Sequence, residues 1–255
     1  MITFDEAQIM AWLTPVLWPF LRVLAVFTAA PIFSSRSFPV RARILLALLV
    51  ALSAQATLPP MPVIDLNGPA ALGVAIQQVG IGLAIGFVVR VVFAAFELAG
   101  EVVGFQMGLN FAAFFDPALN NQSSAVARFF AYMASLLFVV LNGHLMVLMA
   151  VTRSFEVFPV TQNFLEALRL MQLYTVGTEL FASALWIALP MLALLLFTNL
   201  ALGIISRVAP QMNVFAIGFP ITLSVGLVGL TATLPMLDQP FQSLLERSIE
   251  VFMGR

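Results

Sequence analysis

The sequence predicts an all-α membrane-class protein of about six long hydrophobic helices that form helical hairpins. Hydrophobic residues make up 62% of its 255 residues and charged residues only 9%. Soluble domains are about 45–50% apolar and about 25% charged. Six apolar stretches also approach the ~20 residues that a bilayer-spanning helix needs. The composition therefore excludes a water-soluble globular domain.

The first three stretches are interrupted by polar residues and prolines. They cover residues 11–33, 44–58 and 70–89. Proline cannot continue a helix, so the proline cluster that begins at Pro59 ends the second stretch. Arg22 in the first stretch and Gln77 and Gln78 in the third would be costly against lipid, because intramembrane polar groups usually face the interior of a bundle. We therefore expect these three side chains to pack against protein.

The last three stretches are more uniformly apolar. They cover residues 129–151, 180–206 and 208–237, and the last two contain no charged residue. Arg207 and Pro210 lie where these two stretches meet, which predicts a hairpin. His144, the only histidine, lies inside the fourth stretch with no acidic residue near it in sequence. A packing role for His144 is therefore favoured over a proton relay.

The distribution of arginine gives a partial membrane topology. Three arginines lie in the turn between the first two stretches, whereas the N-terminal tail contains none. The positive-inside rule then predicts a cytoplasmic first turn and an external N-terminus. If successive helices cross the membrane in alternating directions, the Arg207 turn is also cytoplasmic. Four arginines would then lie outside, against the rule: Arg153, Arg169, Arg247 and Arg255. Bilayer insertion alone does not explain this pattern.

Glycines at four-residue spacing indicate close helix packing. The two series are Gly82 and Gly86, then Gly100, Gly104 and Gly108. Such stripes let two helix backbones approach each other closely. The segment around the second stripe also contains Arg90, Glu97 and Glu101. We expect these three residues, together with Arg22 and Arg128, to form buried charge pairs. This segment is too polar to face lipid.

An apolar segment with loop residues follows the second glycine stripe. Asp116-Pro117 and Asn120-Asn121 are typical of loops, and Ser123 or Ser124 is suited to cap the next helix. Two interpretations stay open: a loop buried in its own fold, or a plug that lines a conduit. The second depends on the rule that irregular backbone at membrane depth occurs only inside protein or along a cavity.

No chemical site is predicted. The chain has no cysteine and a single histidine, which excludes thiolate and histidine-rich metal sites. Glu97 and Glu101 share a helix face, but ion pairing explains them more simply than acid–base catalysis. No phosphate-binding GxxxxGK[ST] loop is present. We therefore expect a protein without enzyme activity, cofactor or metal.

Three strings together resemble the FliR family of flagellar type III export-gate subunits, a resemblance that covers nearly the whole chain. The first is Arg22 with Ala30-Pro31-Ile32-Phe33 and Pro39-Val40-Arg41. The second runs from Glu97 through Gly104-Phe105-Gln106-Met107-Gly108 to Asp116-Pro117. The third is the continuous string from Arg207 to Pro220.

The resemblance implies assembly with FliP and FliQ into a funnel-shaped gate in the inner membrane, at the flagellar basal body, with its core raised toward the periplasm. It implies a FliP-like region at residues 1–178 and a FliQ-like hairpin with a C-terminal tail at residues 179–255. FlhB packs against such gates, and unfolded flagellar proteins pass through them. We expect partner contacts at the cytoplasmic turn, at Arg207, Pro210, Gln211 and Asn213.

The family also implies a plug that closes the channel at rest, and we expect it at residues 107–121. Its residues here would be Met107, Asn110, Phe111, Phe114, Phe115, Asp116 and Pro117. Three alternatives remain: an injectisome export-gate homologue, a stand-alone small-molecule transporter, and a membrane enzyme. No internal repeat supports the transporter, and the missing catalytic set disfavours the enzyme.

Overall fold

The structure is a computed structural model of the whole chain. It describes residues 6–66, 68–109, 124–161, 169, 171, 174–211 and 214–254. These residues form helices and turns and contain no strand. The predicted all-helical fold class is confirmed.

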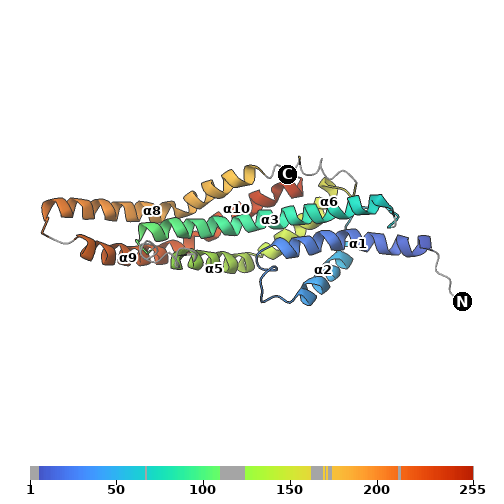
Figure 1. Cartoon of the computed structure of the whole chain (residues 1–255), viewed down its shortest axis with the longest axis horizontal. Helices are drawn as coiled ribbons and strands as arrows, with labels where there is room; N and C mark the ends of the chain where they lie inside the picture. The colour runs from blue at the N-terminus through green and yellow to red at the C-terminus, as the bar shows by residue number, and fades with distance from the viewer. Residues whose placement is uncertain are drawn as a thin grey trace. The chain divides into compact units, whose positions relative to one another are not determined.

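The described helices follow one another along the chain (Figure 1). They are α1 (Glu6–Ala29), α2 (Val40–Ala54), α3 (Pro69–Gln106), α5 (Ala125–Val140), α6 (Gly143–Val157), α8 (Thr175–Val208), α9 (Val214–Thr233), the short 3₁₀ helix η2 (Leu234–Met236) and α10 (Asp238–Met253). α2 begins directly after Pro39 and ends before the proline cluster, as the fixed φ of proline requires.

The predicted count of six membrane helices is not confirmed. Among the described residues, four helices are long and apolar enough to cross a bilayer, or five if α5 and α6 together form one bent span. α2 has 15 residues and is therefore about 22 Å long, shorter than the ~30 Å hydrocarbon core. The third stretch belongs to one 38-residue helix, α3, which continues through Gly100 and Gly104 and ends at Gln106, so Gly108 lies in the turn after it.

The fourth stretch is a broken helix rather than a straight one. α5 and α6 are bent by 68° at the break between them. Asn142 lies at this break with φ 55°, in the left-handed region that Asn tolerates better than most residues. The Asn142-Gly143 pair therefore ends α5 and lets α6 begin in a new direction.

The chain divides into two compact units. The first contains Met1–Val91, Asn142–Gly177 and Leu245–Arg255, and the second contains Val92–Leu141 and Thr178–Leu244. α3 contributes its first part to one unit and its last part to the other.

In the first unit, α1 packs against α2 and against the first part of α3. The turn after α1 is stabilised by aromatic contacts, with the Phe27 and Phe33 rings stacked at 4.5 Å and Phe38 edge-on to Phe33. Trp18 of α1 is buried with Ala71 and Val74 of α3. A separate aromatic contact joins Phe158 and Phe252.

The second unit has an aromatic core. The Phe241 ring packs edge-on against Phe93 and Phe96 of α3, and Phe93 also contacts Phe138 of α5. α8 buries a narrow seam: Ala184, Ile187, Ala188, Met191, Leu195 and Leu202. Much of the remaining surface of α8 is apolar and exposed in the part of the chain that the structure describes.

Candidate functional site

A fully buried arginine is the centre of the first unit. Arg22 of α1 donates through Nε to Gln78 Oε1 at 2.9 Å, through Nη1 to Ser154 Oγ at 2.9 Å, and through Nη2 to the carbonyl oxygen of Phe158 at 2.8 Å. Its guanidinium also lies 3.6 Å from the centroid of the Phe155 ring. One side chain therefore connects α1, α3, α6 and the segment after α6.

Two glutamines extend this cluster. Gln78 donates to Gln77 Oε1 at 2.9 Å, and Gln77 in turn donates to the carbonyl of Pro159 at 3.2 Å and to Thr161 Oγ1 at 3.0 Å. The backbone N–H of Thr161 donates back to Gln77 Oε1 at 2.9 Å. Because buried polar groups are stable only when they are hydrogen-bonded, this network accounts for three polar residues in otherwise apolar helices.

The charged residues assigned to buried pairing lie in different environments. Arg22 has neutral oxygen partners in the described part of the chain. Arg90 and Arg128 are exposed, and Glu97 and Glu101 are half-buried. The pairing of these five residues with one another or with other subunits stays a prediction.

The glycine stripes lie where helix backbones meet. A Cβ added at Gly82 would contact the backbone of Arg22 and lie 2.7 Å from Ala25 Cβ, and one at Gly86 would lie 2.5 Å from Ala29 Cβ. At Gly100 it would lie 2.6 Å from the Cα of Ala127. Side chains at these three positions would collide with α1 or α5, so close approach requires glycine there.

The base of the loop after α3 is anchored by an unusual helix cap. Ser124 is the N-cap of α5, and its Oγ accepts from the N–H of Ala127 at 3.1 Å, so the predicted serine cap is confirmed at Ser124. The N–H of Ser124 itself donates to Oε1 of Glu101 at 2.8 Å. Gly104 lies against the Ser124 side chain. α3 therefore supplies both a carboxylate and space for the first turn of α5.

The other end of the loop packs against α9. The Met107 side chain is buried against Gly226, and Thr222 Oγ1 donates to the Met107 carbonyl at 3.4 Å. Gly108 adopts φ +79° beside the Phe219 ring. The remaining predicted plug residues lie outside the described part of the chain: Asn110, Phe111, Phe114, Phe115, Asp116 and Pro117.

The cap predicts a measurable local stability. Replacing Ser124 by Ala should cost about 1 kcal/mol at the start of α5, and Glu101→Ala should cost about 1–3 kcal/mol because a backbone N–H loses its acceptor. Both variants should speed hydrogen exchange of the Ala127 amide. Ser135→Ala is the control, since the Ser135 hydroxyl donates to the Ala131 carbonyl in its own helix. Equal exchange in all three variants would contradict this role.

The predicted partner-contact turn is exposed where it is described. α8 ends at Val208 and α9 begins at Val214, and Arg207, Pro210 and Gln211 are exposed between or beside them. Asn213 lies outside the described residues. A hairpin of two long apolar helices is therefore present, as the sequence predicts.

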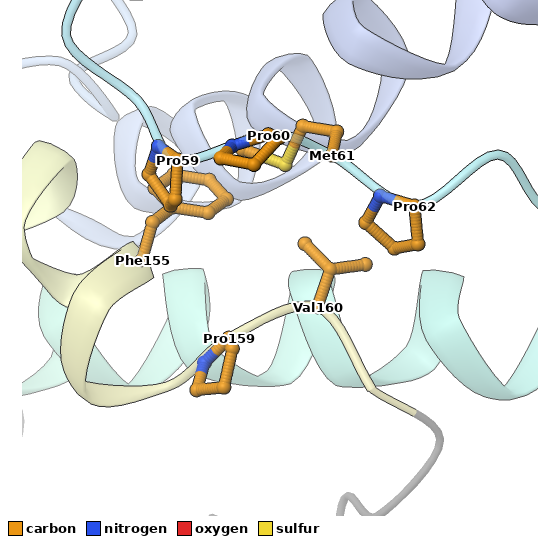
Figure 2. Close-up of a pocket in the computed structure, with 7 residues that line it drawn as sticks. All are labelled: Pro59, Pro60, Met61, Pro62, Phe155, Pro159 and Val160. Atoms are coloured by element: carbon orange, nitrogen blue, oxygen red, sulfur yellow. The ribbon is translucent and has the colours of Figure 1, made fainter.

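A pocket of about 290 Å³ lies next to the arginine cluster. Pro59, Pro60, Met61 and Pro62 run along one side and Val160 and Pro159 lie opposite, and Phe155 also lines the pocket (Figure 2). None of these lining side chains carries a charge. Its walls therefore offer carbonyl oxygens and apolar surface rather than catalytic groups.

Sequence reasoning did not identify the acceptors around Arg22. Ser154 and Phe158, which accept from Arg22, lie far along the chain from it, as does Thr161 from its donor Gln77. Ser154 is a small polar residue within an apolar helix, which was the available signal. The backbone carbonyls of Phe158 and Pro159 could not be identified as acceptors from the sequence, because every residue has a carbonyl.

Comparison with known proteins defines the family. The family model for bacterial export proteins, family 1, matches residues 13–248. The chain belongs to this export family. A relative named flagellar biosynthetic protein FliR, from Escherichia coli (strain K12), is 40% identical over 239 residues, covering 93% of this chain and 90% of the relative.

Two further relatives of the export-family chain carry the same name. The FliR of Pectobacterium carotovorum subsp. carotovorum is 39% identical, over 94% of this chain and 92% of its own length. The FliR of Buchnera aphidicola subsp. Schizaphis graminum is 32% identical, over 98% and 96%. The similarity therefore spans both units, including the arginine cluster and the α8–α9 hairpin.

Proposed function

We propose that this export-family chain is a channel subunit of the flagellar type III export gate, which passes unfolded flagellar proteins across the inner membrane. The family match over residues 13–248, together with relatives named as flagellar biosynthetic proteins, carries this proposal. Those relatives also favour the flagellar system over its injectisome counterpart. The chain acts as a structural component and not as an enzyme.

FliP-like and FliQ-like subunits are the proposed partners. Residues 1–178 form the FliP-like region, and residues 179–255 form the FliQ-like hairpin with its tail. The apolar windows of α8 and α9 are only 28% and 22% buried within this chain. Apolar helix faces of that extent need either lipid or neighbouring helices, and side-by-side assembly supplies the latter.

The FlhB-like partner is proposed to contact the cytoplasmic turn between α8 and α9. Exposed Arg207, Pro210 and Gln211 support a contact there, and Asn213 completes the proposed surface. The gate lies in the inner membrane at the basal body, and its core projects toward the periplasm. α3, with 38 residues, is about 57 Å long and exceeds the ~30 Å hydrocarbon core, which fits a helix that continues beyond the bilayer.

The loop after α3 is proposed as the plug of the channel. Its two ends are held by described contacts: Met107 on Gly226, and Ser124 on Glu101. Burial of each phenylalanine ring contributes about 1.5–3 kcal/mol. The three rings of Phe111, Phe114 and Phe115 would therefore keep the channel closed while still yielding to a driven substrate.

Removing the plug should make the gate leak. Deleting residues 110–121 from the assembled gate, or replacing Phe111, Phe114 and Phe115 by Ala, should raise ion leakage in cells or vesicles, because the apolar stopper is lost. Phe105→Ala is the control, since Phe105 is a 62% exposed phenylalanine on the preceding helix. Unchanged leakage in the deletion would remove the plug role.

Co-purification tests the proposed function as a whole. The chain is expressed with its FliP-like and FliQ-like neighbours, purified by a tag on this subunit, and weighed by native mass spectrometry. A stable hetero-oligomer is expected. A monomer or homodimer, with the partners present but unbound, would overturn the assignment and favour a stand-alone transporter.

A further inference from the structure

The start of α2 carries a concentrated positive charge. Arg36 and Arg41 are exposed and Arg43 is half-buried. The Nε of Arg43 is buried and has no hydrogen-bond partner among the described residues. Between Glu6 and Asp65 the chain contains no acidic residue. These three arginines therefore have no carboxylate near them in sequence.

One face of α2 is apolar and exposed in the described part of the chain. α2 packs against α1 and buries Ala47, Ala51 and Ala54. Large side chains elsewhere on α2 remain substantially exposed: Val40 63%, Ile44 43%, Leu45 59%, Leu48 38%, Leu49 52% and Leu52 47%. An exposed leucine face thus begins directly beside the arginines.

We propose that this surface binds anionic phospholipid, with the phosphate at Arg36, Arg41 and Arg43 and an acyl chain along the leucine face. The guanidinium group donates two parallel hydrogen bonds to phosphate oxygens, which favours arginine at such a site. The helix is too short to span the bilayer, so its basic start and apolar face suit the membrane interface.

The charge arrangement favours an anionic lipid over a zwitterionic one. The positive-inside rule predicts that the turn before α2 lies on the cytoplasmic side, where the leaflet surface carries negative charge. Each arginine near such a surface strengthens binding by roughly fivefold. This inference concerns the lipid around the subunit, and it goes beyond the export role proposed above.

Native mass spectrometry of retained lipid tests the proposal. The full chain, alone and with its co-purifying subunits, is prepared in micelles containing equal amounts of phosphatidylglycerol and phosphatidylcholine with the same acyl chains. We expect several-fold more phosphatidylglycerol on the wild type. R36Q/R41Q/R43Q should lose that preference. L45S/L49S should lower retention of both lipids.

The control carries the same charge change elsewhere. R153Q/R169Q/R247Q replaces three exposed arginines of the same unit and should keep the preference for phosphatidylglycerol. Equal retention of the two lipids by the wild type, or an unchanged preference in R36Q/R41Q/R43Q, would overturn the proposal. Loss of co-purifying subunits from R36Q/R41Q/R43Q, with no lipid preference in the wild type, would assign the arginines to a protein contact instead. Retained lipid tests the lipid site and co-purifying subunits test the export-gate function, so either proposal can fail without the other.

Discussion

Replacing Arg22 by alanine is expected to lower the free energy of unfolding by about 3 kcal/mol or more. The change removes three hydrogen bonds and leaves Gln78 Oε1, Ser154 Oγ and the Phe158 carbonyl without their donor. Each buried polar atom without a partner costs about 1–3 kcal/mol. The measurement is denaturant-induced unfolding of the purified chain in detergent micelles, followed by circular dichroism.

Two further variants separate the contributions at Arg22. Arg22→Lys keeps the charge but loses the fork geometry, so it should recover only part of the stability. Arg153→Ala is the matched control, because Arg153 is exposed and directly precedes Ser154. Its effect should stay within about 0.5 kcal/mol. If Arg22→Ala and Arg153→Ala unfold alike, the cluster does not hold these helices together.

Placing alanines at Gly82 and Gly86 is expected to force α1 away from α3, at a cost of roughly 2–6 kcal/mol. The new Cβ atoms would lie 2.7 Å from Ala25 Cβ and 2.5 Å from Ala29 Cβ. Adding methyl groups to a packed interface typically costs about 1–3 kcal/mol each. The same unfolding measurement, with a lower yield of folded chain, would report the loss.

The control for this substitution lies on the same helix. A Cβ at Gly73 would meet nothing within 4 Å. Gly73→Ala should therefore be neutral or stabilising by up to about 1 kcal/mol, through the better helix propensity of alanine. In the double variant Gly82→Ala/Arg22→Ala, the two losses of unfolding free energy should not add, because a Cβ at position 82 would contact the Arg22 backbone. Similar effects at Gly73 and Gly82 would rule out steric contact as the cause.

The arginine cluster shows where sequence reasoning was sufficient and where it was not. A charged side chain in an apolar stretch must face protein, so the burial of Arg22 could be predicted from its cost in lipid. Its partners could not, because one of its acceptors is the backbone carbonyl of Phe158, and the neighbouring Gln77 likewise donates to the carbonyl of Pro159. Every residue carries a carbonyl, so residue type does not mark which one is used.

The helix count shows the same division. Hydropathy locates apolar stretches, but it does not show that α3 continues through Arg90, Glu97 and Glu101 to Gln106. Nor does it show that the fourth stretch bends by 68° at Asn142. Charges on a packed helix are tolerated, and a left-handed residue interrupts a helix without changing its hydropathy. Both outcomes depend on backbone geometry and on neighbouring elements.

By itself the sequence determined the fold class, the membrane character and the glycine positions where helices meet, because these follow from composition and helical periodicity. Only the tertiary structure decided which helix each glycine contacts, that Glu101 holds the start of α5, and that one face of α2 is left uncovered. These features depend on contacts between residues distant in sequence, and such contacts are specified by packing of the whole chain rather than by any local pattern.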